Sequence, residues 1–429
     1  MLKNIFHRLK GVDIIKVFSL NALSTLIRML AGMVSVKVVA VIIGPVGIAL
    51  LGQLNNFNTI LLGLANGGIG AGVTKYVAEY KNDENAIKYY LSNALRITLS
   101  CSTLVAIILI MGCRQLSRLI LISDEYYYVF IIFGFTIFLY TLNTLFISIV
   151  NGYKKFERYV AINIAGTVIG IVYSVTLVFF LGLPGALINA VTFQSIVFFI
   201  TLWMCRKFRW MQWEYFRERF NRPVIKKYLG YSLMTIVSIA LLPVSQMLLR
   251  GYVMSELSPS EAGIWEGMNR ISSMYLSVIT SAFSVYYLPR LSEISDPKEL
   301  HNEVFKCYKI IIPMLLCAGI LIFFLRHFIL WVLFTPEFSS MERLFSWQLM
   351  GDLFKMCSWL LSFIMVAKAR TKLFITTEII FTLLYVFMCF FFLKMNGIVG
   401  LTQGYLSNYI LYLITMLVLF RNVIKPQKA

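Results

Sequence analysis

The sequence predicts an all-α integral membrane protein, with twelve transmembrane helices in two six-helix lobes around a central cavity. Three observations predict this fold. Of the 429 residues, 59% are hydrophobic and only 14% are charged, whereas soluble domains carry about 25% charged residues. Twelve apolar stretches reach the length of about 20 residues that a helix needs to cross a bilayer. A basic loop at the middle of the chain separates these stretches into two sets of six.

The apolar stretches assign a set of spans to each lobe. The first lobe, residues 1–205, is predicted to contain spans at about 16–42, 46–70, 90–113, 127–151, 159–181 and 184–205. Residues 206–227 are predicted to form a basic cytoplasmic linker in the membrane interface, because aromatic and arginine side chains alternate along it. The second lobe, residues 228–429, is predicted to contain spans at about 228–250, 262–288, 305–325, 341–367, 372–393 and 398–420.

The loops between these spans predict the orientation of the chain. An even number of spans places both termini on one side of the membrane, and the loops on that side hold 28 of the 39 Lys and Arg residues. The opposite loops hold six: Arg114, Arg118, Arg250, Arg326, Arg343 and Lys394. Because cytoplasmic loops are enriched in Lys and Arg, both termini are predicted to lie in the cytoplasm.

Five basic side chains lie inside the predicted spans: Arg28, Lys37, Arg96, Arg270 and Lys355. Each costs roughly 2.5–3.5 kcal/mol at the bilayer centre, so such residues generally face a polar cavity. A cavity lined by cations favours an anion. A phosphate or diphosphate is the anionic group that fits best, because Arg and Lys form charge-assisted hydrogen bonds with phosphate oxygens. The sequence therefore predicts a transporter of a negatively charged substrate.

The first-lobe cations differ in position. Arg28 and Lys37 are nine residues apart, about 13 Å along a helix, so they would mark two depths of one passage. Arg96 lies near the cytoplasmic start of its span, and its alternative role is to extend to the interface. The amides Asn55, Asn56 and Asn58 follow in the second span, where they either bind sugar hydroxyls or hold helices together.

The second-lobe cations lie close to acids along the chain. Arg270 follows Glu266 at i+4 and Lys355 follows Asp352 at i+3, so local ion pairs are the alternative to substrate binding. Together with Glu378, these two acids are the candidate ion-coupling or cavity acids.

Other classes of protein fit the sequence poorly. The seven cysteines show no CxxC spacing and the three histidines are far apart, so no cofactor and no metal site are predicted. The net charge of +19 does not indicate a nucleic-acid partner, because the cations are distributed between hydrophobic stretches and are not gathered in one soluble domain. No paired-carboxylate, Ser–His–Asp or Walker pattern is found, which favours a transporter over an enzyme.

Several stretches carry a family resemblance. They are GPVG (Gly44–Gly47), GVTKYVAEY (Gly72–Tyr80), GIWEG (Gly263–Gly267), AFSVYYLPRL (Ala282–Leu291), WQLMGD (Trp347–Asp352) and VAKA (Val366–Ala369). On these residues the chain resembles the Wzx flippases of the multidrug/oligosaccharidyl-lipid/polysaccharide exporter superfamily, especially their lipid III flippase and O-antigen translocase branches. Arg28 and Lys37 match basic residues that the family carries in its first span.

The resemblance implies a fold and a function. It implies two six-helix lobes that form a V, and transport of an undecaprenyl-diphosphate-linked oligosaccharide, either an O-antigen unit or the enterobacterial common antigen lipid III. Transport would run by alternating access from the cytoplasmic to the periplasmic leaflet of the bacterial inner membrane. The implied partners are the lipid-linked oligosaccharide and membrane lipids, with polysaccharide polymerase machinery as a further candidate.

Two alternatives stay open. A cation-coupled multidrug exporter of the same superfamily would have a cavity dominated by acids. A membrane glycosyltransferase or ligase acting on the same lipid would carry a large periplasmic loop with catalytic residues.

Overall fold

The computed structural model describes residues 11–282, 286–294, 296–368 and 370–424. Within these ranges the regular secondary structure is entirely helical, which confirms the predicted all-α class. Part of the AFSVYYLPRL stretch and one residue of VAKA lie outside the described residues.

The longer helices overlap the predicted spans, with ends that differ by up to eight residues, and short helices that the prediction did not include lie between them. The first are α2 (Gly11–Ala65), α3 (Gly70–Tyr80), α4 (Glu84–Met111), α5 (Cys113–Leu121), α6 (Tyr127–Gly152) and α7 (Phe156–Cys205). Two short 3-10 helices follow in the linker, η1 (Arg209–Met211) and η2 (Trp213–Phe216). The remainder are α8 (Arg222–Glu256), α9 (Pro259–Ala282), α10 (Leu288–Glu293), α11 (Pro297–Phe324), α12 (Arg326–Leu333), η4 (Pro336–Leu344), α13 (Phe345–Ala367), α14 (Thr371–Asn396), α15 (Ile398–Leu419) and α16 (Arg421–Ile424).

Eight of the described helical segments are long and apolar enough to cross a membrane. One membrane crossing needs about 20 helical residues. Two of these segments have at least twice that length: Ser24–Ala65 has 42 residues and Phe156–Cys205 has 50. The class of all-helical integral membrane protein is thereby confirmed. The exact number of twelve spans stays a prediction.

Each of the two long helices is broken by a glycine. In α2 the break is at Gly44 (φ 64°, ψ −168°), and in α7 it is at Gly182 (φ 61°, ψ −132°). Both pairs of angles lie where an L side chain is strained, and a proline follows each break, at Pro45 and Pro184. These glycines therefore allow one continuous stretch of chain to reverse into two helical halves.

Replacing Gly182 by alanine is expected to destabilise the protein by about 1–3 kcal/mol, the cost of holding a side chain in this backbone region. A Cβ at Gly182 would have no heavy atom within 4 Å, so the loss would report backbone strain and not a clash. Gly319, inside α11, is equally open, and Gly319→Ala serves as the control with an unchanged or slightly higher melting temperature. Thermal unfolding of the purified variants in detergent measures both effects. Equal melting temperatures for the two variants would contradict the expectation.

The described chain divides into two compact units. The first unit comprises the residues up to 42 together with Leu50–Val244, and the second comprises Ile43–Ala49 and the residues from Ser245 onward. The domain boundaries expected from the sequence, at 205 and 228, stay a prediction, as does a cavity between the lobes.

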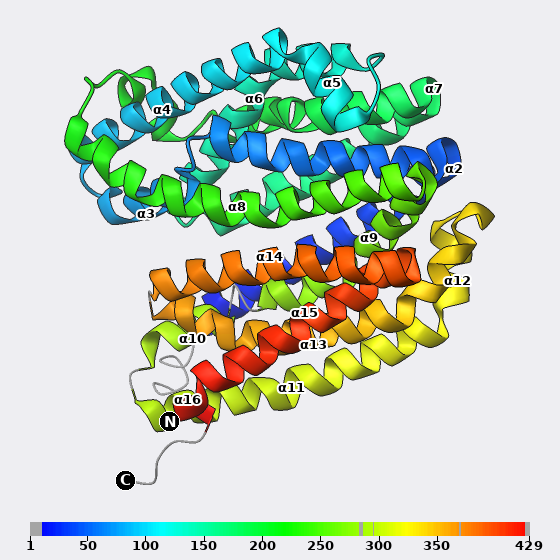
Figure 1. Cartoon of the computed structure of the whole chain (residues 1–429). Helices are drawn as coiled ribbons and strands as arrows, with labels where there is room; N and C mark the ends of the chain where they lie inside the picture. Colours follow the sequence, from blue (N-terminus) through cyan, green and yellow to red (C-terminus); the bar gives the residue numbers. More distant parts are fainter. Residues whose placement is uncertain (1–10, 283–285, 295, 369, 425–429) are drawn as a thin grey trace. The chain divides into compact units, whose positions relative to one another are not determined.

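In the first unit, α6 packs against α4 and α7, and α3 packs against α4 and α6 (Figure 1). Their contacts form a core at one end of the unit that includes Val73, Leu91, Ile149 and Phe198. In the second unit, α13 packs against α9, α11 and α15, and α14 packs against α15. The core there includes buried side chains of α13 such as Met356, Leu360 and Ile364.

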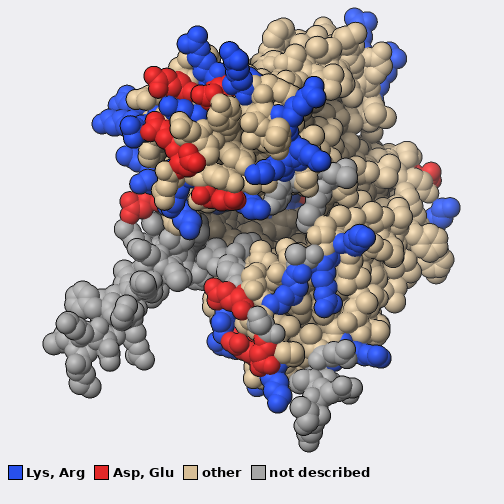
Figure 2. Space-filling view, turned by 90° about the vertical axis from the view of Figure 1, so that its left-hand side faces the viewer, with Lys and Arg blue, Asp and Glu red and all other residues tan. Residues whose placement is uncertain are grey.

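The linker between the halves folds back onto the start of α4. Trp210 and Tyr215 are buried, and Ser92 Oγ donates a hydrogen bond to the Tyr215 carbonyl oxygen at 3.1 Å. Trp213 and Phe220 point outward, with 72% and 61% of their surface exposed. The linker is thus anchored to the protein by one set of aromatic rings and exposes another. Its location in the membrane interface stays a prediction. Lys and Arg side chains gather with several carboxylates on the molecular face drawn in Figure 2.

Candidate functional site

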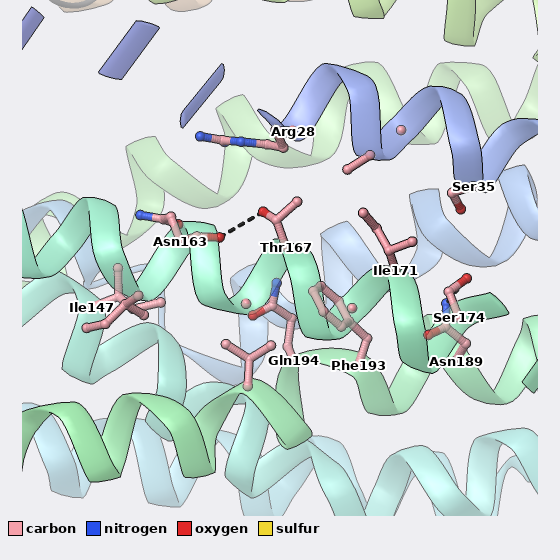
Figure 3. Close-up of a pocket in the computed structure, with 16 residues that line it drawn as sticks. Arg28, Ser35, Ile147, Asn163, Thr167, Ile171, Ser174, Asn189, Phe193 and Gln194 are labelled. Atoms are coloured by element: carbon pink, nitrogen blue, oxygen red, sulfur yellow. Dashed lines mark hydrogen bonds between the residues drawn. The ribbon is translucent and has the colours of Figure 1, made fainter. Parts of the chain in front are cut away.

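A pocket of about 380 Å³ lies within the first unit. It is lined by residues of α2, α6 and both halves of α7 (Figure 3). The lining residues are Arg28, Ala31, Gly32, Ser35, Ile147, Ile162, Asn163, Gly166, Thr167, Gly170, Ile171, Ser174, Asn189, Phe193, Gln194 and Val197. This lining contains one charged side chain and several amides and hydroxyls, on an otherwise apolar wall.

Arg28 is the charged side chain of this pocket. It extends from α2 on the side that faces α7 (Figure 3). Arg28 Nη2 donates a long hydrogen bond of 3.5 Å to Ser24 Oγ, one turn earlier on the same helix. No carboxylate of the described part of the chain lies within ion-pair distance of Arg28. The guanidinium group therefore has N–H groups available to donate hydrogen bonds to a ligand.

The neutral polar groups come from the reversal of α7 at Gly182. In the first half, Asn163, Thr167 and Ser174 recur at helical spacing and share one face. In the second half, Asn189 and Gln194 line the same pocket (Figure 3). The two halves are packed closely, because a Cβ at Gly166 would lie only 3.0 Å from Val197 Cγ1.

Hydrogen bonds within the unit orient the amides of the second half of α7. Asn143 Nδ2 donates to Gln194 Oε1 at 2.9 Å, and Thr201 Oγ1 donates to Asn143 Oδ1 at 2.6 Å. Asn189 Nδ2 donates to Ser174 Oγ at 3.3 Å, while Asn189 Oδ1 is buried without a hydrogen-bond partner. The pocket therefore offers both donors and acceptors whose directions are largely set before a ligand binds.

Of the predicted first-lobe residues, Arg28 lines this pocket. Lys37 on α2 and Arg96 on α4 are half-buried, and neither is part of the pocket lining. Asn55 is exposed and Asn56 is half-buried. Asn58 is buried, and its Nδ2 donates to the Ala190 carbonyl oxygen of α7 at 3.1 Å, which joins two helices.

Sequence reasoning missed the amides of α7. Asn163, Asn189 and Gln194 are spread over 32 positions and two predicted spans, so nothing in the sequence joins them into one site. The available signal was the spacing of Asn163, Thr167 and Ser174 within an otherwise apolar span, which places polar groups on one helix face.

In the second unit, Arg270 makes the local ion pair that its spacing allows. Arg270 Nε lies 3.2 Å from Glu266 Oε1, and Glu266 is also paired with Arg250. The prediction that Arg250 lies in an outward loop is wrong: it lies in α8, its side chain is completely buried, and it also stacks over the Trp265 ring at 5.7 Å. The reason is that α8 extends to Glu256 and packs its arginine against a carboxylate on α9.

Asp352 has neutral partners. It is completely buried and accepts hydrogen bonds from Ser272 Oγ, from Tyr275 Oη at 2.6 Å and from Tyr405 Oη at 2.8 Å. Gln348 Nε2 also donates to it at 3.3 Å. The i+3 spacing does not lead to an ion pair with Lys355 among the described contacts.

Lys355 lies instead among aromatic rings of α13 and α15. Its Nζ is 5.0 Å from the centroid of the Trp359 ring and 5.7 and 5.6 Å from those of Tyr405 and Tyr409. This arrangement stabilises a cation through the ring quadrupoles. The remaining predicted acid, Glu378 on α14, accepts a long hydrogen bond of 3.4 Å from Tyr412 Oη. Within the described ranges, no three His, Cys, Asp or Glu side chains converge as they would around a metal ion.

The helices and the pocket define a polytopic membrane protein, and its fold is that of solved MATE and MurJ structures. The chain superposes on the inward-facing conformation of a MATE-family multidrug resistance transporter with a TM-score of 0.79, at 13% identity, over 95% of this chain and 100% of the other. It superposes on the lipid II flippase MurJ in an inward closed conformation with a TM-score of 0.75, at 15% identity, over 94% and 87% of the two chains.

Sequence comparison identifies the family. The family model described as polysaccharide biosynthesis protein matches residues 52–343, and the chain belongs to this family. It is also 29% identical to the lipid III flippase of Escherichia coli (strain K12), over 91% of this chain and 94% of that protein. The resemblance inferred from the sequence motifs is thereby confirmed.

Proposed function

We propose that this protein is a flippase that moves an undecaprenyl-diphosphate-linked oligosaccharide from the cytoplasmic to the periplasmic leaflet of the bacterial inner membrane. The observation that carries the proposal is Arg28, a cation without a carboxylate partner among the described residues, in a pocket otherwise lined by neutral groups. Family membership and the similarity to a lipid III flippase support the same substrate class.

The chemistry of the substrate matches the pocket. A diphosphate accepts charge-assisted hydrogen bonds from a guanidinium group, which can bind two oxygens at once. The helices around the pocket expose apolar side chains such as Val168, Val172 and Phe199, which suit a hydrocarbon environment where the polyprenyl chain would stay. The charged head group would therefore cross inside the protein while the tail remains in lipid.

The mechanism we propose is alternating access between two lobes, residues 1–205 and 228–429, joined by the basic linker 206–227. Both termini would lie in the cytoplasm, as the Lys and Arg content of the loops indicates. Lys37 would provide a second basic side chain that binds the anionic head group in the first lobe. Transport would require no catalytic step, and polysaccharide polymerase machinery is a candidate partner on the periplasmic side.

A cation-coupled multidrug exporter is the competing function, since its fold is shared. A pocket for cationic drugs should hold a carboxylate, because an opposite charge is needed to bind a cation away from water. The lining of the first-unit pocket contains an arginine and no carboxylate. The competing function is therefore disfavoured by the charge of this pocket.

Reconstituted transport tests the proposed function. The purified protein in liposomes is expected to expose a fluorescent undecaprenyl-diphosphate-linked glycan to the opposite leaflet, and to restore one surface polysaccharide in bacteria that lack individual flippases. Efflux of cationic drugs together with no movement of any diphosphate-linked glycan would overturn the proposal.

Asp352 is the proposed coupling acid of the second unit, since its complete burial makes its charge costly without a bound cation, and the hydroxyl donors Tyr275 and Tyr405 offset only part of that cost. Asp352→Asn keeps the side-chain shape and is expected to make transport independent of an imposed proton or sodium gradient. Glycan translocation measured with and without each gradient checks this result. Glu342→Gln, at a partly exposed ion pair, is the control and should keep the response of the parent protein. An unchanged gradient response in Asp352→Asn would count against the coupling role.

A further inference from the structure

We infer that the neutral part of the first-unit pocket is a sugar subsite, in which Phe193, Asn163, Asn189 and Gln194 bind the sugar attached directly to the diphosphate. This inference rests on the proposed function and gives a sugar-binding role to the neutral side chains of the same pocket. Arg28 would hold the diphosphate, and the α7 residues would determine which glycan is accepted.

The donors and acceptors of the pocket match a sugar. Gln194 accepts from Asn143 Nδ2 through its Oε1, and its Nε2 donates no hydrogen bond among those of the described residues. Asn189 Oδ1 is a buried acceptor without a partner. A hydroxyl or acetamido group can both donate and accept, so a sugar offers a partner of the right kind to each of these atoms. A second diphosphate would not, since its oxygens only accept.

The support behind Gln194 indicates that its direction is fixed. Asn143 is completely buried and receives a hydrogen bond of 2.6 Å from Thr201 Oγ1. Thr201 is buried as well. This chain of side chains holds the Gln194 amide in one orientation, which reduces the cost of ordering it when a ligand binds.

The apolar part of the pocket suits the other face of a sugar ring. Phe193 lines the pocket beside Gly170, and a Cβ at Gly170 would collide with the Phe193 ring. The glycine therefore determines how closely the ring approaches the first half of α7. An aromatic ring with adjacent Ile171 and Val197 offers an apolar surface for C–H groups or an acetamido methyl, while the amides bind the polar edge.

The size of the pocket limits what it holds. Sites for drug-sized ligands occupy about 300–1,000 Å³, and this pocket of about 380 Å³ is near the lower end. It accommodates one sugar next to the diphosphate and not a whole repeat unit. Specificity for the first sugar would therefore be encoded here, and the outer sugars would be read elsewhere or not at all.

The test compares two probes on the protein reconstituted in nanodiscs: undecaprenyl diphosphate alone, and undecaprenyl diphosphate carrying one N-acetylhexosamine. Binding affinities are measured for the parent protein, Gln194→Leu and Asn163→Leu. We expect the parent to bind the sugar-bearing probe more tightly than undecaprenyl diphosphate alone, by about 3–10-fold for each hydrogen bond made to the sugar. Each variant should lose that preference and keep its affinity for the bare diphosphate. Gln115→Leu, an exposed residue of α5, is the matched control and should retain the preference.

The outcomes separate the two proposals. A preference that persists in both pocket variants, or that is absent in the parent while both probes bind, would overturn the sugar subsite and leave the flippase proposal intact. Absence of binding by either probe to the parent would overturn the proposed function itself. Gln194→Leu also removes the hydrogen-bond partner of buried Asn143, so a melting curve is measured for each variant. Asn163→Leu loses only the hydrogen bond to the Tyr159 carbonyl oxygen of its own helix. If Gln194→Leu unfolds, the binding result for Asn163→Leu decides between the outcomes.

Discussion

Arg28→Ala is expected to reduce translocation of the diphosphate-linked glycan by about 10–100-fold. A hydrogen bond to a charged group contributes about 1.5–3 kcal/mol, and each 1.4 kcal/mol corresponds to a tenfold change in affinity. Since no described carboxylate pairs with Arg28, the substitution removes a ligand contact without leaving an unpaired acid behind. Initial rates of glycan transfer in proteoliposomes measure the effect.

The conservative variant separates charge from geometry in this experiment. Arg28→Lys keeps the charge and loses the planar fork that binds two oxygens, so an intermediate rate is expected. Arg114→Ala, which removes an exposed arginine of α5 that lies over the Tyr127 ring, is the control and should transport at the parental rate. Transport by Arg28→Ala at the parental rate would refute the assignment of Arg28 to the diphosphate.

Glu266→Gln is expected to destabilise the second unit by about 3–5 kcal/mol, the cost of breaking a buried ion pair from one side. Glu266 is shared by Arg250, which is completely buried, and Arg270, of which 19% is exposed. Removing the single carboxylate leaves two cations facing a neutral amide. Thermal or denaturant unfolding of the purified protein in detergent should therefore show a large loss.

The control for this prediction is another ion pair in the same unit. Arg326 Nε and Glu342 Oε1 are 3.2 Å apart but partly exposed, and Glu342→Gln should cost less than about 1 kcal/mol. The double variant Arg250→Met with Glu266→Gln removes the most buried cation together with its partner and should recover part of the lost stability. A double variant less stable than Glu266→Gln alone would argue against the unpaired arginine as the cause.

The candidate site shows which contacts can be predicted from the spacing of residues in the sequence. Arg28 could be singled out from the sequence because it lies within an apolar stretch of membrane-spanning length, where a cation is costly near the bilayer centre. The spacing of Arg270 and Glu266 likewise predicted a local contact that the structure contains. By contrast, Lys355 and Asp352 have a similar spacing and form different contacts, since Tyr275 and Tyr405 from other helices supply the hydrogen bonds to Asp352.

By itself the sequence determined that this is an all-helical membrane protein, where its long apolar helices lie to within several residues, and which cations need an explanation. These properties follow from local hydropathy, because each helix satisfies its own backbone hydrogen bonds within one apolar stretch. Only the tertiary structure decided that Arg250 is buried against Glu266 and that Asn163, Asn189 and Gln194 meet around one pocket. Those contacts depend on how α7 reverses at Gly182 and on which helix faces pack together, and side chains far apart in the chain then share one environment.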